Sequence, residues 1–304
     1  MALTRLLAAV LSLALMPSPT APPATPRDTL LVSTAWLAQH LHDADVVLLH
    51  VGEKSEYDAR HLPGARYVDF HELANGTPAT GGLTLELPDS EQLRSRLAGL
   101  GISDTSRVVV YYGNDWVSPS TRVIFTLDYA GLDRVSLLDG GMQTWIREGR
   151  EVTVEVPAAR PGTLSPLKVR PLVVDADFVR SHVSAPHFAV VDARATSFYD
   201  GVQPGGPKDH RVPGHIAGAR SVPFDSVTAA DLTLKSDDEL KAIFAKAGVQ
   251  TGDTVVTYCH IGQQATAVLF AARTLGHPVL LYDGSFEDWA RRGYPVENPS
   301  KKDH

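Results

Sequence analysis

A chain of 304 residues, of which 43% are hydrophobic and 21% charged, has the composition of an ordinary globular protein and the length of two typical domains. Its formal net charge of −7 argues against broad binding to nucleic acids or to anionic membranes, since both require a positive protein surface. The single cysteine cannot form a disulfide within the chain.

The first residues are typical of a secretory leader. Arg5 supplies a positive start, an apolar stretch follows at residues 6–16, and a spacer rich in Pro, Ala and Thr comes next. The apolar stretch is too short to span a bilayer but suits the core of a signal peptide. We assign residues 1–28 to a signal peptide and spacer, and we expect export to the periplasm with no membrane span in the mature form. Because prolines crowd the cleavage site, the alternative is a disordered N-terminus of a cytosolic protein.

The remainder of the chain contains the same pattern twice, which indicates a duplication. Similar segments occur in the same order in both copies. The matched pairs are residues 45–50 with 187–192, 61–66 with 215–220, 108–112 with 254–258, and 139–145 with 283–289. We therefore expect two equivalent domains, at residues 29–152 and 172–298, joined by a proline-rich linker at 153–171.

In chain order, each copy begins with a helix that is capped by Ser33 or Asp175. A Val-rich strand comes next, followed by a loop with shared His, Gly, Ala and Arg residues. The later elements are expected at 91–100 (helix), 108–112 and 254–258 (strands), 120–129 and 264–275 (helices), and 135–138 and 279–282 (strands). Each copy then closes with an Asp-Gly turn and a helix that carries Trp145 or Trp289. Short apolar strands alternating with helices predict the α/β class, with a mostly parallel sheet covered by helices on both faces in each domain.

Functional side chains are expected where the two copies differ, because duplicated domains tend to share their core positions. Cys259 directly follows a strand of the second copy, and the aligned position in the first copy is Gly113. Arg194 follows another strand of the second copy, and its counterpart is Gly52. A nucleophile and a cation are thus predicted in the second copy alone.

The second copy also carries an insertion at residues 201–213. This segment is rich in Gly and Pro, and it includes Lys208, His210 and Arg211. Insertions in surface loops cost little free energy, so the length difference by itself indicates no function. A lid or an entry site for substrate fits the same sequence equally well.

The segment 259–264, Cys-His-Ile-Gly-Gln-Gln, joins a predicted strand to a predicted helix, where open α/β sheets bind their ligands. Gly262 allows a tight turn, so successive backbone N–H groups and the helix N-terminus can together form an anion-binding nest. Such donors stabilise a thiolate and a terminal persulfide alike, and His260 and Arg194 could add positive potential. The alternative is that Cys259 is a small buried residue at the end of a strand.

Four segments together resemble those of tandem rhodanese-fold sulfurtransferases, and the resemblance covers residues 29–298. They are Asp192-Ala-Arg194, Gly214-His-Ile-Ala-Gly-Ala219, Tyr258-Cys-His-Ile-Gly-Gln-Gln-Ala265 and Asp283-Gly-Ser-Phe-Glu-Asp-Trp289. The family implies two rhodanese-like domains, with a catalytic cysteine loop in the C-terminal domain and an inactive N-terminal partner.

The resemblance also implies a reaction. Cys259 would accept the outer sulfur of thiosulfate as a persulfide and pass it to cyanide or to a thiol. Arg194 would orient the anionic donor. The loop residues expected to bind substrate and persulfide are His260, Ile261, Gly262, Gln263 and Gln264. No metal and no organic cofactor is implied, the partners are small molecules, and the oligomeric state is not indicated.

Two positions depart from the patterns of the family. Ile261 stands where thiosulfate-specific members have a basic residue and 3-mercaptopyruvate-specific members have Ser, and Phe198 stands where the latter have a second Arg. The missing Arg favours thiosulfate over a donor that carries a carboxylate, with Lys208 or Arg211 as candidates to supply the missing charge. A 3-mercaptopyruvate sulfurtransferase and a non-catalytic sulfur carrier are the alternatives. A related cysteine-dependent phosphatase is disfavoured, because Ala265 stands where its chemistry needs an Arg.

Overall fold

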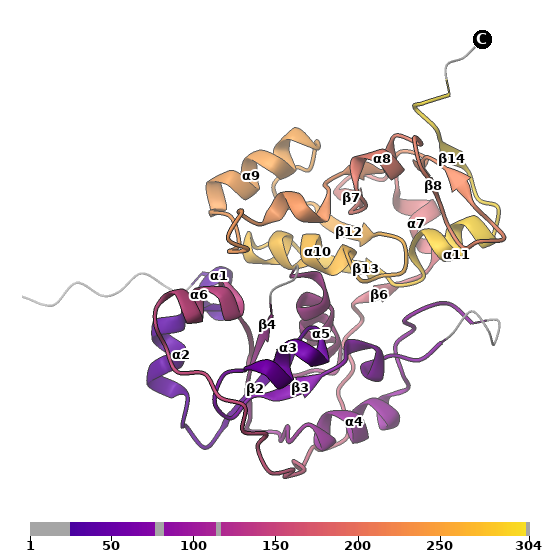
Figure 1. The fold of residues 1–304 in the computed structure, drawn as a ribbon. Helices are drawn as coiled ribbons and strands as arrows, with labels where there is room; N and C mark the ends of the chain where they lie inside the picture. The colour runs from indigo at the N-terminus through magenta and orange to yellow at the C-terminus, as the bar shows by residue number, and fades with distance from the viewer. Residues whose placement is uncertain (1–24, 77–81, 114–116, 302–304) are drawn as a thin grey trace, which may run out of the picture.

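The computed structural model describes residues 25–76, 82–113 and 117–301, and it shows two α/β domains that lie against each other (Figure 1). Each domain is built on a five-stranded sheet flanked by helices, which confirms the predicted fold class. Within these described ranges, no helix is long and apolar enough to cross a membrane.

The predicted leader lies for the most part outside the described residues. Its last residues are folded, however, because helix α1 (Pro26–Leu30) begins at the capping residue Thr25. Arg27 of this helix forms an ion pair with Asp237 of the C-terminal domain at 2.9 Å. The boundary predicted at residue 28 is therefore too late, since Thr25 already belongs to the folded region.

The N-terminal sheet is entirely parallel, with the strand order β1-β5-β4-β2-β3. Its strands are β1 (Leu31–Val32), β2 (Val46–Val51), β3 (Arg66–Val68), β4 (Arg107–Tyr112) and β5 (Val135–Leu138). The Val- and Leu-rich central strands are buried along most of their length, as in parallel sheets that helices cover on both faces.

The C-terminal sheet repeats this arrangement in the order β11-β7-β12-β13-β6, again with all strands parallel. Its strands are β6 (Val173–Val174), β7 (Phe188–Asp192), β11 (Arg220–Ser221), β12 (Thr254–Tyr258) and β13 (Val279–Tyr282). Two short antiparallel pairs complete the domain: β8 (Pro204–Gly205) with β9 (Val212–Pro213), and β10 (His215–Ile216) with β14 (Val296–Glu297). The duplication in the sequence is therefore a duplication of the fold.

The two helices whose starts were predicted from a capping residue begin where that residue places them. Ser33 accepts a hydrogen bond from the N–H of Trp36, and Asp175 accepts one from the N–H of Phe178, so both predicted helix starts are confirmed. The N-terminal helices after α1 are α2 (Thr34–His40), α3 (Lys54–Ala59), η1 (Phe70–Leu73), α4 (Ser90–Gly99), α5 (Ser118–Tyr129) and α6 (Gly141–Arg147). The C-terminal helices are α7 (Ala176–His182), α8 (Thr196–Tyr199), η3 (Phe224–Val227), α9 (Asp237–Lys246), α10 (Ala265–Thr274) and α11 (Ser285–Arg291).

Helices α5 and α10 pack against each other between the two sheets (Figure 1). Almost every residue of α5 is buried, because one side of the helix covers its own sheet and the other side contacts the second domain. The hydroxyls of Thr121 and Thr266 meet across this interface at 2.9 Å. One hydrophobic core thus runs through both domains, and it holds the start of α5 against the loop that precedes α10.

The linker at residues 153–171 follows the surface of the N-terminal domain. Thr153 exchanges two backbone hydrogen bonds with His61, each at 2.8 Å. Further along, the N–H of Gly162 donates to the carbonyl of Ala98 at 2.7 Å. These contacts make the linker part of the domain surface.

Candidate active site

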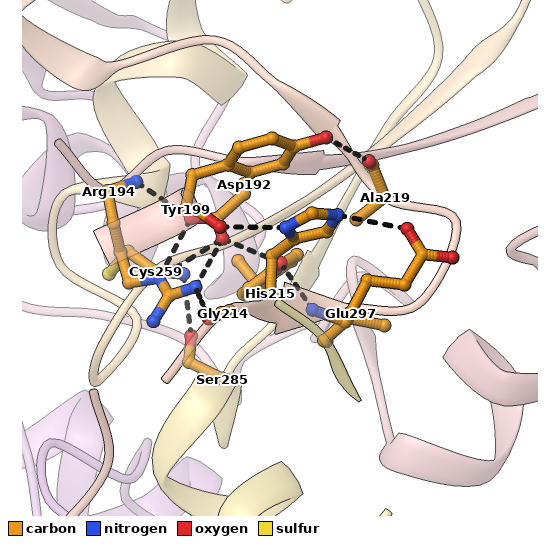
Figure 2. Close-up of polar contacts among 11 residues, drawn as sticks. Asp192, Arg194, Tyr199, Gly214, His215, Ala219, Cys259, Ser285 and Glu297 are labelled. Carbon is orange, nitrogen blue, oxygen red and sulfur yellow. Dashed lines mark hydrogen bonds and ion pairs between the residues drawn. The ribbon is translucent and has the colours of Figure 1, made fainter. Parts of the chain in front are cut away.

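Cys259 lies directly after strand β12, and two hydrogen bonds fix its backbone. Its N–H donates to Oγ of Ser285 at 3.2 Å (Figure 2). Its carbonyl accepts from the N–H of Phe286 at 3.0 Å. Ser285 is fully buried, donates its hydroxyl hydrogen to the Tyr282 carbonyl, and has a left-handed φ of +51°, which is costly for a residue other than glycine. Sequence analysis missed Ser285 as a site residue. The available signal was that the first copy has Gly141 at this position.

The loop after Cys259 contains a run of backbone donors that lack acceptors. Within the described ranges, no atom accepts a hydrogen bond from the N–H groups of His260, Ile261, Gly262, Gln263 and Gln264. Helix α10 begins immediately afterwards at Ala265, whose N–H extends the run by one donor, whereas Thr266 and Ala267 already donate to the carbonyls of Gln263 and Gln264 at 3.1 Å each. Unpaired donors at a partly buried site cost free energy unless a ligand accepts from them, and this loop is therefore suited to hold an anion.

Arg194 and Asp192 form an ion pair close to the cysteine (Figure 2). The Nη2 of Arg194 lies 2.6 Å from Oδ2 of Asp192, and both side chains are fully buried. The guanidinium also donates to the carbonyl of Gly214 at 2.9 Å, and it lies over the ring of Phe286. Burial disfavours the charged guanidinium, but the carboxylate of Asp192 outweighs burial and raises the pKa of Arg194. Arg194 is therefore a fixed positive charge.

This geometry changes the role expected for Arg194. From the sequence, Arg194 was expected to offer its positive charge to the anionic sulfur donor. In the structure this charge is already balanced by the carboxylate of Asp192. Its Nη1 is different: it is buried and has no hydrogen-bond partner in the described part of the chain. Arg194 is also near enough to Cys259 for the two to interact electrostatically. The guanidinium predicted beside the cysteine is present, with one donor group still available.

His260 does not supply the positive potential that was expected of it. Burial, assisted by the charge of Arg194, lowers the pKa of His260 to about 4. Its ring stands edge-on to that of Phe198, with the ring centroids 4.5 Å apart. The imidazole is therefore uncharged at neutral pH and forms part of the apolar wall of the site.

A cavity of about 750 Å³ lies next to the loop. Residues from three parts of the chain line it, among them His260 and Ile261 of the loop, Lys208 and Arg211 of the insertion, and Thr84 of the N-terminal domain. The insertion thus forms one wall of the cavity. Cys259 itself is fully buried and is not part of the lining, so its burial is that of the alternative considered from the sequence, a small buried residue at the end of a strand.

The last loop residues face the N-terminal domain. The side chain of Gln263 donates to Oγ of Ser118 at 3.2 Å, whereas Oε1 of Gln264 is buried without a partner among the described residues. The carbonyl of Gly262 accepts from Nη1 of Arg122, a residue of helix α5, at 3.0 Å. Arg122 was not predicted as a site residue. The sequence feature that could have identified Arg122 is its position within the predicted helix at 120–129, whose residues are largely apolar.

Strand register corrects one correspondence between the copies. Tyr111 and Tyr258 are equivalent, since the hydroxyl of each accepts from the backbone N–H that follows the shared histidine, at 3.1 Å in both domains. Cys259 therefore corresponds to Tyr112, one residue before Gly113. By sequence the Val-rich strands align equally well in either register, and the contacts of the two tyrosine hydroxyls identify the correct one.

The equivalent site of the N-terminal domain lacks these chemical groups. Tyr112 is buried and donates its hydroxyl hydrogen to the carbonyl of Leu232 in the other domain at 2.6 Å. His50 takes the place of the carboxylate of the ion pair, and burial lowers its pKa to about 4. Gly52 takes the place of the guanidinium. A cysteine and a guanidinium at these positions are thus present in the C-terminal copy only, as predicted, and the carboxylate of Asp192 that pairs with the guanidinium was not part of the prediction.

Comparisons with known proteins match this geometry. The family model "Rhodanese-like domain" matches residues 33–148 and again residues 175–292. The crystal structure of YnjE superposes with a TM-score of 0.80 at 26% identity, covering 91% of this chain and 70% of that chain.

Curated relatives extend over most of the chain. The thiosulfate sulfurtransferase of Rattus norvegicus is 33% identical and covers 89% of this chain and 95% of its own. The sulfur carrier protein TtuD of Thermus thermophilus is 32% identical, over 88% of this chain and 96% of its own. The 3-mercaptopyruvate sulfurtransferase of Rattus norvegicus is 29% identical, over 87% and 93%. The chain belongs to the rhodanese family, in its tandem form with two rhodanese-like domains, among the sulfurtransferases.

Proposed function

We propose that this protein is a sulfurtransferase whose Cys259 takes the outer sulfur of thiosulfate and passes it to cyanide or to a thiol. The observation that carries the proposal is the loop after the only cysteine of the chain. Five consecutive N–H groups there find no acceptor among the described residues, and a terminal persulfide is an anion of the size that such a loop accepts.

The reaction divides into two displacements on sulfur. The thiolate of Cys259 attacks the outer sulfur of thiosulfate, the S–S bond of the donor breaks, and sulfite departs with the bonding electrons. Cyanide or a thiolate then attacks the terminal sulfur of the persulfide, the new S–S bond breaks, and the thiolate of Cys259 is restored. With cyanide the product is thiocyanate. The electrons balance within the two steps, so no external oxidant or reductant is consumed.

The surrounding groups have distinct roles in this scheme. The loop N–H groups stabilise the negative charge of the persulfide. The Nη1 of Arg194 is a buried, charged donor with no hydrogen-bond partner among the described residues, and it would donate to an oxygen of thiosulfate. Lys208 and Arg211 line the cavity and would attract the dianionic donor towards it.

Two other assignments follow from relatives of this chain. A 3-mercaptopyruvate sulfurtransferase would need a cation for the carboxylate of its donor, and Phe198 stands where that subgroup has an Arg. A sulfur carrier would form the persulfide but would turn over slowly with small acceptors. The large cavity is compatible with either, so the donor and the acceptor have to be compared directly.

Steady-state kinetics test the proposal. Thiocyanate formation is measured while thiosulfate and cyanide are both varied, and a persulfide intermediate gives parallel double-reciprocal lines. Cys259→Ser should abolish turnover, and thiocyanate formation by that variant would refute the mechanism. A higher kcat/KM with 3-mercaptopyruvate than with thiosulfate would move the assignment to that donor, and persulfide formation without turnover would favour a carrier.

We also propose that the protein is exported, because residues 6–16 have the length and composition of a signal-peptide core. Thr25 and Arg27 contact the folded domains, so cleavage should occur before Thr25. N-terminal sequencing of the mature protein tests this, and an intact leader on a cytosolic protein would contradict it.

A further inference from the structure

Arg122 connects the N-terminal domain to the cysteine loop of the C-terminal domain. It lies on helix α5 and is 2% exposed. Its Nη1 donates to the carbonyl of Gly262 at 3.0 Å and to Oδ1 of Asp283 at 2.6 Å, while its Nη2 donates to the carbonyl of Leu85 at 2.6 Å. A side chain of the domain without a nucleophile therefore holds the backbone of the loop that contains one.

The hydrogen bond to Gly262 determines where the next N–H group points. A trans peptide unit is planar, and its C=O and N–H point in opposite directions. Because Arg122 holds the Gly262 carbonyl on one side, the N–H of Gln263 is directed to the other side. That N–H is one of the loop donors that lack an acceptor among the described residues.

The loop has little freedom to place this peptide in another way. Gly262 has a φ of +83°, in the left-handed region that favours glycine. A Cβ at this position would lie 2.8 Å from the carbonyl oxygen of Asp283 and 3.0 Å from Nη1 of Arg122. The guanidinium and the loop backbone are thus fitted closely together.

We propose that Arg122 is a positioning residue for sulfur transfer: by holding the Gly262 carbonyl, it keeps the Gln263 N–H oriented to stabilise the sulfur anion on Cys259. This inference rests on the proposed function of the loop. It assigns to the N-terminal domain a direct part in the chemistry of its partner, and it explains why an arginine is buried between the domains.

The test compares Arg122→Lys with Arg273→Lys, in the full-length chain. Arg273 lies at the opposite end of α10 and also crosses the interface, since its Nη1 is 2.7 Å from Oδ2 of Asp128. Lysine keeps the positive charge at both positions, but an ammonium group cannot span two carbonyls as the planar guanidinium does. The same substitution therefore removes the loop contact in one variant and an ordinary interdomain contact in the other. The Asp192–Arg194 pair, the carboxylate of Asp283 and the uncharged imidazole of His260 are unchanged in both variants.

Two readouts are taken. The first is the pH at which alkylation of Cys259 by iodoacetamide reaches half of its maximal rate, measured without any sulfur donor. Arg122→Lys should raise this midpoint by about one pH unit, and Arg273→Lys should leave it unchanged. The second is thiocyanate formation, where Arg122→Lys should lower kcat by about 100-fold with little change in the KM for thiosulfate.

The alkylation midpoint is measured without a sulfur donor, so it tests Arg122 even if the wild-type protein proves inactive with thiosulfate. Equal midpoints and equal kcat values for the two variants would overturn the inference, because Arg122 would then act only as an interdomain contact. Arg122→Gln serves as a second variant and should show at least the same shift. A folded Arg122→Gln protein with the wild-type midpoint would also overturn the inference.

Discussion

Replacing Arg194 by methionine separates its structural contribution from its chemical one. The ion pair with Asp192 is 2.6 Å long and fully buried, and removing one partner of such a pair costs about 3–5 kcal/mol because the remaining charge is left buried. Asp192 keeps two other donors, the hydroxyl of Tyr258 at 2.7 Å and the backbone N–H of residue 194 at 2.9 Å. We therefore expect Arg194→Met to lower the free energy of unfolding by about 3 kcal/mol, near the lower limit of this range, as measured by urea unfolding monitored by circular dichroism.

A second substitution supplies the control. The double variant Arg194→Met with Asp192→Asn leaves no buried charge at the position of the ion pair. Its free energy of unfolding should therefore be about 2 kcal/mol higher than that of Arg194→Met alone. Thiocyanate formation should nevertheless stay low in both variants, because the unpaired Nη1 is absent from both. If the stabilised double variant regained wild-type turnover, Arg194 would have a purely structural role and the account of donor binding would be refuted.

Three further predictions concern charged and titratable side chains, two of them at the cysteine loop and its cavity and one in the N-terminal domain. Lys208→Gln combined with Arg211→Gln should raise the KM for thiosulfate about two- to thirtyfold with kcat little changed, since exposed charges contribute about 0.2–1 kcal/mol each; unchanged kinetics would remove the insertion from the substrate site. His260→Asn should leave the pH profile of kcat/KM unchanged around neutrality, because burial lowers the pKa of His260 to about 4; the disappearance of an inflection near the ordinary histidine pKa would show the opposite. His50 has a pKa lowered to about 4 by burial, against 6.5 for the unperturbed group, so the unfolded chain takes up a proton first and stability falls as the pH drops through this window. At about pH 5 this effect lowers the free energy of unfolding by about 2 kcal/mol, and His50→Leu should not show this loss when urea unfolding is compared at about pH 7 and pH 5. An equal loss in the wild-type protein and in His50→Leu would contradict the prediction.

Local sequence was sufficient for most of the fold. Ser33 and Asp175 cap their helices through contacts within three residues, and the apolar segments 135–138 and 279–282 form strands with the predicted bounds. These features depend on neighbours along the chain. The duplication then made it possible to find Cys259 and Arg194 as differences between the copies.

The remaining features depend on contacts that local sequence does not show. Arg122 reaches a loop far along the chain, and only the packing of α5 on α10 brings it there. The neutral state of His260 and the complete burial of Cys259 likewise follow from the elements packed around the loop. The sequence comparison matched Cys259 with Gly113, whereas the structure matches it with Tyr112. The two Val-rich strands align equally well one residue apart, so their sequences did not distinguish these matches.

Peptide mass spectrometry after incubation with thiosulfate detects a persulfide on Cys259 directly. We expect the peptide containing Cys259 to gain one sulfur atom, and we expect cyanide to remove this atom and release thiocyanate. A protein that turns thiosulfate over while this peptide never carries the extra sulfur would contradict a persulfide at Cys259, as would the same gain of sulfur in Cys259→Ser.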